Sequence, residues 1–290
     1  MSKFILTTSS TADLPNSYLE QHNVGCVRFS FLISDEEYKD DFVTSMPAGV
    51  FYNRLRNGEM SRTSMVNAAS FEEFFRGYLD RGESILHIEF SSALSGSYQN
   101  AAVVAKKLNK EYADAKVIVI DSLCASLGLG LLVDYARRMR DEDKDLDETA
   151  AWVERNKLNV IHWFTVDDLD FLRRGGRVSG VSAFLGGMLK IKPVMDVNNE
   201  GRLIPLYKVR GRKKAIATMV EKMKADAIDP KNEPIFISHG DCMDDAKRLA
   251  GLIKEEWGAD VQLINYVGSV IGSHSGPGTL ALFYMGKKRT

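Results

Sequence analysis

The first half of the chain alternates short strand-like runs with longer runs of helical periodicity, which limits the folds open to it. Strand-like runs occur at Phe4–Leu6, Ile85–Phe90 and Val117–Ile120. In the intervening segment Ser70–Asp80, apolar side chains recur every three or four residues, which predicts an amphipathic helix. Strand–helix repeats of this kind form a parallel sheet with right-handed crossovers. We therefore expect an α/β protein whose N-terminal domain is Rossmann-like.

Ligands of such sheets bind where the strands end, so the loops that follow the strands are the first place to look for a site. Here those loops are Thr7–Asp13, Ser91–Ser97 and Asp121–Ser126, and the first two are rich in serine and threonine. Asp13 is also expected to cap the first helix, with Pro15 in its first turn.

The second half has a different pattern, and we expect the domain boundary after residue 157. Residues 158–290 contain a basic, glycine-rich segment at 173–192 and a hairpin-type turn at Asn198–Gly201. The remaining pattern predicts strands near 160–166, 235–238, 261–267 and 280–284, with helices at 213–224 and 244–257. This is an α+β domain with a mixed or antiparallel sheet.

Charge and cysteine content exclude several classes of protein. The chain of 290 residues has 38 basic and 39 acidic side chains, so nucleic acid is not expected as its main partner. No apolar run is long enough for a membrane span, and the first residues do not resemble a signal peptide. The cysteines, Cys26, Cys124 and Cys242, are odd in number and widely spaced. We expect a reduced protein in the cytoplasm.

Motifs for nucleotide binding, a nucleophile elbow or a metal site are absent. His239 and Asp241 supply only two ligands, which do not make a metal site. The acids Asp167, Asp168 and Asp170 are more typical of a loop or helix start than of acid–base catalysis. No metal, catalytic residue or cofactor is therefore expected.

Three polar clusters remain, at 61–64, 91–98 and 272–278. The second separates a buried strand from a helix, whose free N–H groups favour an anion, and Gly96 would let that anion approach the backbone. Together the clusters indicate hydroxyl and amide donors around a small anion such as a carboxylate. The plainer interpretation is that the first two cap helices and the third forms a turn.

An apolar run rich in glycine could hold a chain attached to that carboxylate. It comprises Phe184, Leu185, Met188, Leu189 and Ile191, with glycines at 180, 186 and 187. Ordinary helix packing in the core is the alternative.

The motifs resemble those of the DegV family, over essentially the whole chain. The resemblance rests on Thr8–Pro15, Thr63-Ser64, Ser91–Gln99, Leu172–Ser179, Ile191–Pro193, Lys208–Gly211, His239–Asp241 and Gly272–Gly278. No single motif is specific to the family, but the occurrence of these motifs in this order is specific to it.

This resemblance implies a fatty-acid-binding protein of two domains with a tunnel between them for a long-chain fatty acid such as palmitate. Thr63 and Ser95, with Gly96 and His274 beside them, are implied to hold the carboxylate, with His274 either neutral or protonated. Family members act as the binding subunit of a bacterial fatty acid kinase. The kinase subunit phosphorylates the bound carboxylate, and the acyl phosphate serves phospholipid synthesis.

Three arginines of the glycine-rich segment, Arg173, Arg174 and Arg177, are expected to face that kinase or the transferred phosphoryl group, with a solvated loop as the alternative. The implied protein is a non-catalytic carrier with no cofactor besides its lipid, and it contacts the membrane transiently. Burying ~14 methylenes would contribute roughly 11 kcal/mol of gross transfer free energy.

Two positions depart from the family pattern. Ser9 stands where the family usually has aspartate, and Met65-Val66 stand where it usually has Gln-Pro.

Two other functions compete with the carrier. One is a stand-alone acyl-transfer or hydrolytic enzyme with Ser95 as nucleophile and His274 as base, although no third, orienting group is evident. The other is a structural or regulatory module in which the lipid only stabilises the fold.

Overall fold

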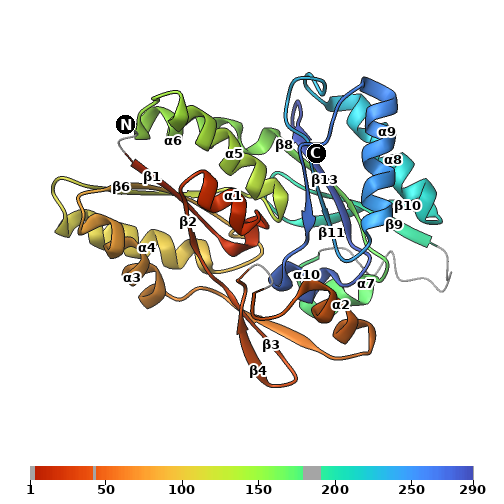
Figure 1. Ribbon diagram of the computed structural model, residues 1–290, viewed down its shortest axis with the longest axis horizontal. Helices are drawn as coiled ribbons and strands as arrows, with labels where there is room; N and C mark the ends of the chain where they lie inside the picture. Colours follow the sequence, from red (N-terminus) through yellow and green to blue (C-terminus); the bar gives the residue numbers. More distant parts are fainter. Residues whose placement is uncertain (1–3, 42–43, 179–190, 290) are drawn as a thin grey trace.

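The computed structural model describes residues 4–41, 44–178 and 191–289, and its architecture is α/β, as the sequence predicts (Figure 1). Four parallel strands form the first sheet in the order β2-β1-β6-β7. They are β1 (Phe4–Ser9), β2 (Val24–Val27), β6 (Ser84–Glu89) and β7 (Val117–Asp121).

Helices cover both faces of this sheet. On one face lie α3 (Ala68–Leu79) and α4 (Ser97–Glu111), and on the other lie α5 (Leu127–Asp141) and α6 (Leu146–Asn156). Because both faces are covered, every residue of these four strands is buried or half-buried, and the predicted helix at 70–80 is confirmed as α3.

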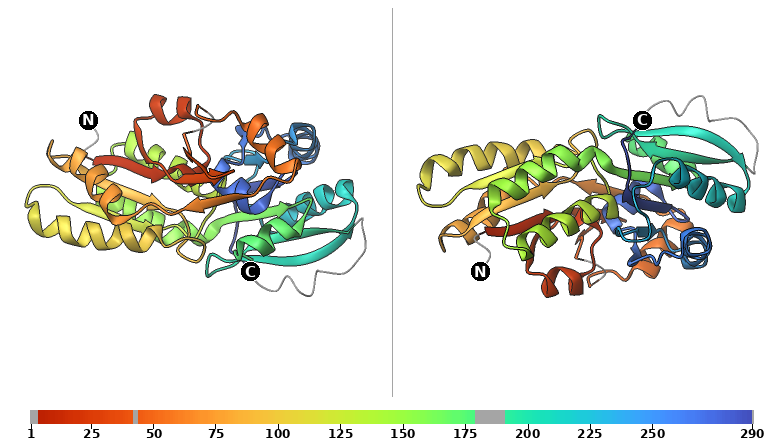
Figure 2. Two further views of the ribbon diagram at one scale, coloured as in Figure 1. Left: turned by 90° about the horizontal axis from the view of Figure 1, so that it is seen from below. Right: turned by 90° about the horizontal axis from the view of Figure 1, so that it is seen from above.

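The second sheet has six strands and is mixed, as expected. Its order is β10-β9-β8-β13-β11-β12, and only β11 and β12 run parallel to each other. The strands are β8 (Val160–Thr165), β9 (Ile191–Val197), β10 (Leu203–Arg210), β11 (Phe236–His239), β12 (Leu263–Tyr266) and β13 (Leu280–Met285). Helices α8 (Arg212–Asp226) and α9 (Met243–Trp257) cover one face, at the end of the molecule opposite α3 and α4 (Figure 2).

A third, small sheet was missed by the sequence analysis. It consists of β3 (Ser30–Ile33), β4 (Glu36–Lys39) and β5 (Ser61–Ser64), in the antiparallel order β4-β3-β5. Helix α2 (Ala48–Arg56) packs beside it, and α10 (Ser269–Ser275) of the second half contacts both. The 61–64 cluster is thus a strand rather than a cap, and Asn67 caps α3 instead.

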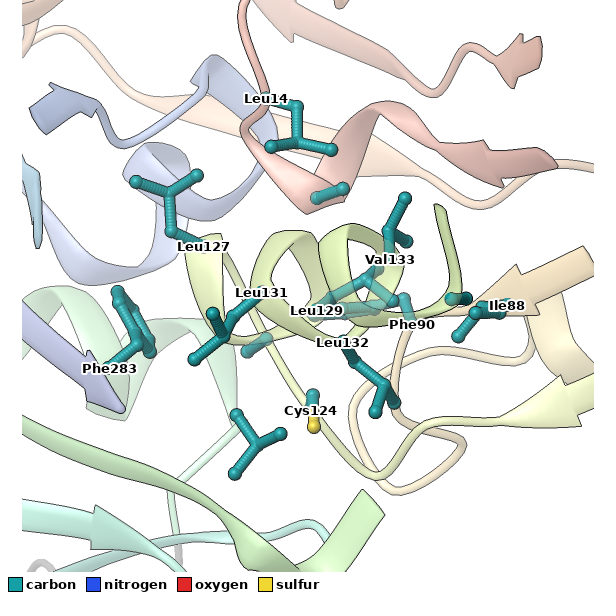
Figure 3. Packing of buried hydrophobic residues seen from close by; sticks show 14 of the residues in the cluster. Leu14, Ile88, Phe90, Cys124, Leu127, Leu129, Leu131, Leu132, Val133 and Phe283 are labelled. Atoms are coloured by element: carbon teal, nitrogen blue, oxygen red, sulfur yellow. The ribbon is translucent and has the colours of Figure 1, made fainter. Parts of the chain in front are cut away.

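Helix α5 packs between the two large sheets and lies at the centre of the main hydrophobic core (Figure 3). Its apolar side chains are buried around the whole circumference, among them Leu127, Leu129, Leu131, Leu132 and Val133. Two glycines bring its backbone close to its neighbours. A Cβ on Gly128 would lie 2.1 Å from His162 Nε2, and one on Gly130 would lie 2.7 Å from the carbonyl oxygen of Ala12.

Asp13 does not cap the first helix, and that prediction was wrong. Helix α1 (Asn16–Gln21) begins after Pro15, whereas Asp13 ends a 3-10 turn with φ of 53°. The Asp13 carboxylate is buried and accepts a hydrogen bond from Ser126, and its carbonyl oxygen accepts one of 2.7 Å from Asn265 Nδ2. Its backbone shape and buried partners thus make Asp13 a link between the two halves.

Ser9, the first departure from the family pattern, belongs to a fully buried polar network. Its hydroxyl donates to Glu89 Oε1 at 2.7 Å, and the other oxygen of that carboxylate lies 2.8 Å from His87 Nε2. An aspartate at position 9 would place a second carboxylate against Glu89, which is unfavourable inside a protein. Serine keeps the buried glutamate paired.

The three cysteines are free thiols. Among the described residues, no helix has the length and apolar character that crossing a bilayer requires.

We predict that Gly130→Ala destabilises the protein by about 1–3 kcal/mol, because the new methyl group meets a backbone oxygen that cannot move aside easily. The matched control is Gly251→Ala on the exposed face of α9, where a Cβ meets nothing within 4 Å. That change should stabilise by about 0.5–1 kcal/mol through helix propensity. Urea unfolding measures both, and equal effects would contradict the close packing of α5.

Candidate functional site

A largely apolar cavity of about 560 Å³ lies between the two large sheets, beside α5 and α10. Its volume falls within the usual range for small-molecule sites. The apolar part of the wall includes Phe29, Phe90, Leu94, Phe164, Leu172 and Phe283. These side chains come from both halves of the chain, so the cavity exists only when the halves are packed together.

One region of the cavity wall is polar, and it brings together the residues named from the sequence. Thr63, Ser95, Gly96 and His274 all line the cavity. Thr63 Oγ1 and His274 Nε2 lie 2.8 Å apart, within hydrogen-bond distance, although 211 residues separate them. Strand β5 carries Thr63, and α10 carries His274. The 272–278 cluster, expected as a turn, therefore begins as the end of a helix.

The Ser95 loop leads from β6 into α4, as the sequence predicts. Gly96 precedes the first residue of α4 and makes no side-chain cap, so Ser95 Oγ accepts the Ser97 N–H instead, at 3.3 Å. Ser97 Oγ in turn accepts the Val66 N–H at 3.1 Å. Proline, the usual residue at this position in the resemblance, has no N–H. Valine at position 66 therefore adds a hydrogen bond between the loop after β5 and α4.

Met65, the other departure, sits on the rim of the cavity. Its side chain is 56% exposed, and its sulfur would lie 2.9 Å from a Cβ on Gly96. The absence of a side chain at Gly96 therefore leaves space for Met65, whose side chain narrows the cavity beside Ser95.

Gly175 brings α7 (Leu169–Gly175) against the histidine. A Cβ at this position would lie 2.4 Å from His274 Nδ1 and 3.3 Å from His274 Cβ, so any side chain would displace the ring. The sequence analysis missed this role, although the Gly-Gly pair in the basic segment was a signal for a close approach.

A second, more polar cavity of about 340 Å³ adjoins the first and shares Thr63, His274 and Arg177 with it. Arg62 and Arg174 also line this cavity, and Glu59 is the acid on its wall. The Thr63–His274 pair thus stands where an apolar chamber meets a basic one.

The three arginines of the basic segment occupy different positions. Arg177 lines both cavities, and its Nε donates to the carbonyl of Leu94 at 3.4 Å. Arg174 lines the second cavity only, with its guanidinium 4.7 Å from the ring centre of Phe171. Arg173 pairs with Asp170 at 2.9 Å and lines neither cavity.

The surroundings of His274 favour the neutral form of its ring in the absence of a ligand. Burial, and to a smaller extent the nearby charge of Arg177, lower the pKa of His274 to about 4. The cavity therefore offers neutral hydrogen-bonding groups at this position.

The arrangement does not couple Ser95 to His274. Ser95 Oγ lies 3.4 Å from Ser97 Oγ, to which it donates, whereas His274 Nε2 is bonded to Thr63. A nucleophile–base pair requires a direct hydrogen bond between the two groups, and the structure places other partners on each.

The remaining polar candidates have structural partners. Asp241 forms an ion pair with Arg56, and buried His239 accepts the Cys242 N–H at 3.3 Å. Asp168 caps α7, as a helix start requires. Within the described ranges, no three histidine, cysteine or acidic side chains gather closely enough to bind a metal ion.

Part of the predicted channel lies outside the described residues. This applies to Phe184, Leu185, Met188 and Leu189 with the glycines at 180, 186 and 187, whereas Ile191 begins β9. The described wall also contains three further serines, Ser126, Ser238 and Ser275. Ser126 ends the predicted loop Asp121–Ser126 and Ser275 belongs to the 272–278 cluster, whereas Ser238, in β11, had no predicted role.

Comparisons with known proteins agree over the full length of the chain. Residues 3–287 match the model of the DegV family of uncharacterised proteins. A DegV domain-containing protein of Clostridium perfringens is 42% identical over 99% of this chain and 98% of its own. A fatty-acid-binding DegV protein of Thermus thermophilus has a TM-score of 0.88 at 30% identity, covering 98% and 99%. The fatty-acid-binding DegV of Bacillus subtilis has a TM-score of 0.84 at 25% identity, covering 99% and 100%.

We predict that His274 makes stability depend on pH. Its folded pKa of about 4 lies below the ordinary value of 6.5, so between these values the unfolded chain binds more protons than the folded one. This contribution is therefore complete above pH 6.5 and is lost as the pH falls toward 4. The melting temperature of the ligand-free protein relative to His274→Gln should decrease from pH 7 to pH 4.5, and a constant difference would contradict it.

Proposed function

The chain belongs to the DegV family, and from that membership and the geometry of the cavity we propose that it binds a long-chain fatty acid such as palmitate. The carboxylate lies at Thr63, Ser95 and His274, and the tail occupies the apolar cavity between the parts formed by residues 1–157 and 158–290. The observation that carries this proposal is the hydrogen bond between Thr63 and His274 on the wall of that cavity.

Burial of the tail supplies most of the binding free energy. About 14 methylenes at ~0.8 kcal/mol each give roughly 11 kcal/mol before the costs of association. The aromatic and aliphatic wall supports this, since it offers the tail few polar contacts. A volume of about 560 Å³ is ample for one extended or bent chain.

The head group is held mainly by neutral donors. A carboxylate loses hydration on entering the cavity and must regain hydrogen bonds there. The Thr63 and Ser95 hydroxyls, the backbone at Gly96 and the imidazole of His274 supply them. A carboxylate beside His274 also favours a proton on the ring, so binding raises the pKa of His274 from about 4.

We further propose that the protein presents this carboxylate to a kinase subunit and is not itself a catalyst. The second cavity supports this, because it reaches the same Thr63–His274 pair and is lined by Arg62, Arg174 and Arg177. A basic chamber beside a carboxylate suits an incoming phosphoryl group. Arg173, near the surface, would meet the partner. The product would be an acyl phosphate for phospholipid synthesis.

The cellular setting follows from this function. The protein would work in the bacterial cytoplasm, where free thiols persist, and would exchange its ligand through transient contact with the membrane.

We predict that Thr63→Val and Ser95→Ala each weaken palmitate binding about tenfold, because each removes one hydrogen bond to a charged group. Long-chain fatty acid should be released from the purified wild-type protein on heating and detected by mass spectrometry. Binding to the delipidated variants is measured by displacement of a fluorescent fatty acid. Thr218→Val, on α8 and remote from both cavities, is the control and should bind normally.

Failure of the wild-type protein to release any fatty acid, together with failure to take up added palmitate, would exclude the function. Unchanged affinity in both variants would exclude the proposed carboxylate site but leave lipid binding intact.

We predict that Arg177→Gln abolishes most acyl-phosphate formation with the ATP-binding subunit of a bacterial fatty acid kinase, while palmitate binding falls less than threefold. The guanidinium faces both cavities, so its loss affects the phosphoryl group more than the tail. The control is Arg248→Gln on the exposed face of α9. Equal losses of binding and phosphorylation would place Arg177 in the fatty-acid site alone.

A further inference from the structure

Three buried serines line the apolar cavity in addition to the residues proposed to hold the carboxylate, and Thr279, also on this wall, uses its hydroxyl within its own loop. Ser126, Ser238 and Ser275 are 5%, 0% and 5% exposed, and all three belong to the wall of the larger cavity but not of the smaller, basic one. A purely apolar tail could not pair with them. Their presence therefore points to a polar group on the ligand itself.

Ser126 and Ser238 form a short hydrogen-bonded relay that ends at the cavity. Ser126 donates its only hydroxyl proton to the Asp13 carboxylate, so Ser238, 2.9 Å from Ser126 Oγ, must donate its own proton to Ser126. Ser238 is left with lone pairs that can accept a hydrogen bond. With a proton on the Asp13 oxygen that faces Ser126, each donor and acceptor is exchanged: Asp13 donates to Ser126, Ser126 donates to Ser238, and Ser238 is free to donate to a ligand.

Ser275 supplies a free hydrogen-bond donor, whereas Ser238 offers an acceptor. Its hydroxyl oxygen is buried and makes no hydrogen bond with any part of the chain that the structure describes. The segment that follows links it to Ser238, because Thr279 donates to the carbonyl of Ser275 at 3.0 Å and Ala281 is the strand partner of Ser238. The two serines thus lie on one wall, built from α10, β13 and β11.

The energetics favour a ligand that satisfies these groups. A buried hydroxyl without a partner destabilises a protein, and a site built to bond a ligand hydroxyl discriminates against ligands that lack one. A hydroxyl group both donates and accepts, so it fits Ser238 in either direction of the relay and accepts from Ser275. A keto group only accepts, and would fit only one direction.

We propose that the preferred ligand is a hydroxylated long-chain fatty acid, whose chain hydroxyl binds at Ser238 and Ser275 while its carboxylate lies at Thr63 and Ser95. This inference rests on the proposed fatty-acid-binding function and adds the chemical class of the acyl chain.

The test compares octadecanoate with octadecanoates that carry one hydroxyl at successive carbons along the chain. The delipidated protein is incubated with equimolar pairs, and bound ligands are quantified by native mass spectrometry. We expect one position, or two adjacent positions, to bind about tenfold tighter than octadecanoate, since one added hydrogen bond changes affinity by that order. Hydroxyls elsewhere should weaken binding, because they are buried unpaired.

Two variants identify the partner groups. Ser275→Ala and Ser238→Ala should reduce the preference for the hydroxylated chain to about twofold or less, with octadecanoate affinity retained. Ser275→Ala should also leave the melting temperature of the ligand-free protein unchanged or higher, since it removes an unpaired hydroxyl. The matched control, Ser122→Ala, removes a buried serine outside the cavity wall and should keep the preference.

The outcomes separate the two proposals. If octadecanoate binds and no hydroxylated isomer binds more tightly, the preference for a hydroxylated chain is refuted while fatty-acid binding stands. If a preference exists but survives in both serine variants, the assigned hydroxyl site is refuted. If neither octadecanoate nor any isomer binds, the proposed function itself fails.

Discussion

Helix α5 can touch both halves of the molecule because two of its residues have no side chain, and the rest of the structure depends on that close contact. Gly128 admits the ring of His162 from the six-stranded sheet, and Gly130 admits the backbone at Ala12, in the 3-10 turn that follows β1 of the four-stranded sheet. The sheets are therefore held at a fixed separation on either side of one helix. The large cavity is the space that remains beyond the start of α5, where Ser126 leads into the helix and lines the wall.

The polar region of that cavity shows how a protein can receive an acid at a neutral imidazole, with Arg177 as the charged group on the same wall. His274 lies against Gly175 and Thr63, and its burial, together with the charge of Arg177, lowers the pKa of the ring to about 4. A permanently charged group at this depth would need a permanent counter-ion, and an empty site would then be unstable. A neutral imidazole tolerates both the empty and the occupied state, which suits a site whose ligand must enter and leave.

The sequence pattern predicted those parts of the fold that depend on residues close together in the chain. Each strand–helix repeat of the first sheet is visible within some thirty residues, and so is the turn at Asn198–Gly201. Strand β5 was missed because Ser-Arg-Thr-Ser has no apolar residue, and it is a strand only through its pairing with β3. Nothing in the residues joins Thr63 to His274 across 211 positions. The family resemblance named both, whereas the serine wall comes from segments that meet only in three dimensions.

The position of β13 has a consequence for how the protein is made. This strand follows all the others along the chain, yet it lies in the middle of the six-stranded sheet, between β8 and β11. Until β13 has been synthesised, β8 and β11 each lack a neighbour on one side. The apolar surface of α5 that packs against this sheet stays uncovered during the same period. Unpaired edges and exposed apolar surface favour aggregation. The nascent chain therefore passes through a stage at which a chaperone has a natural binding surface, and that stage ends when β13 closes the sheet.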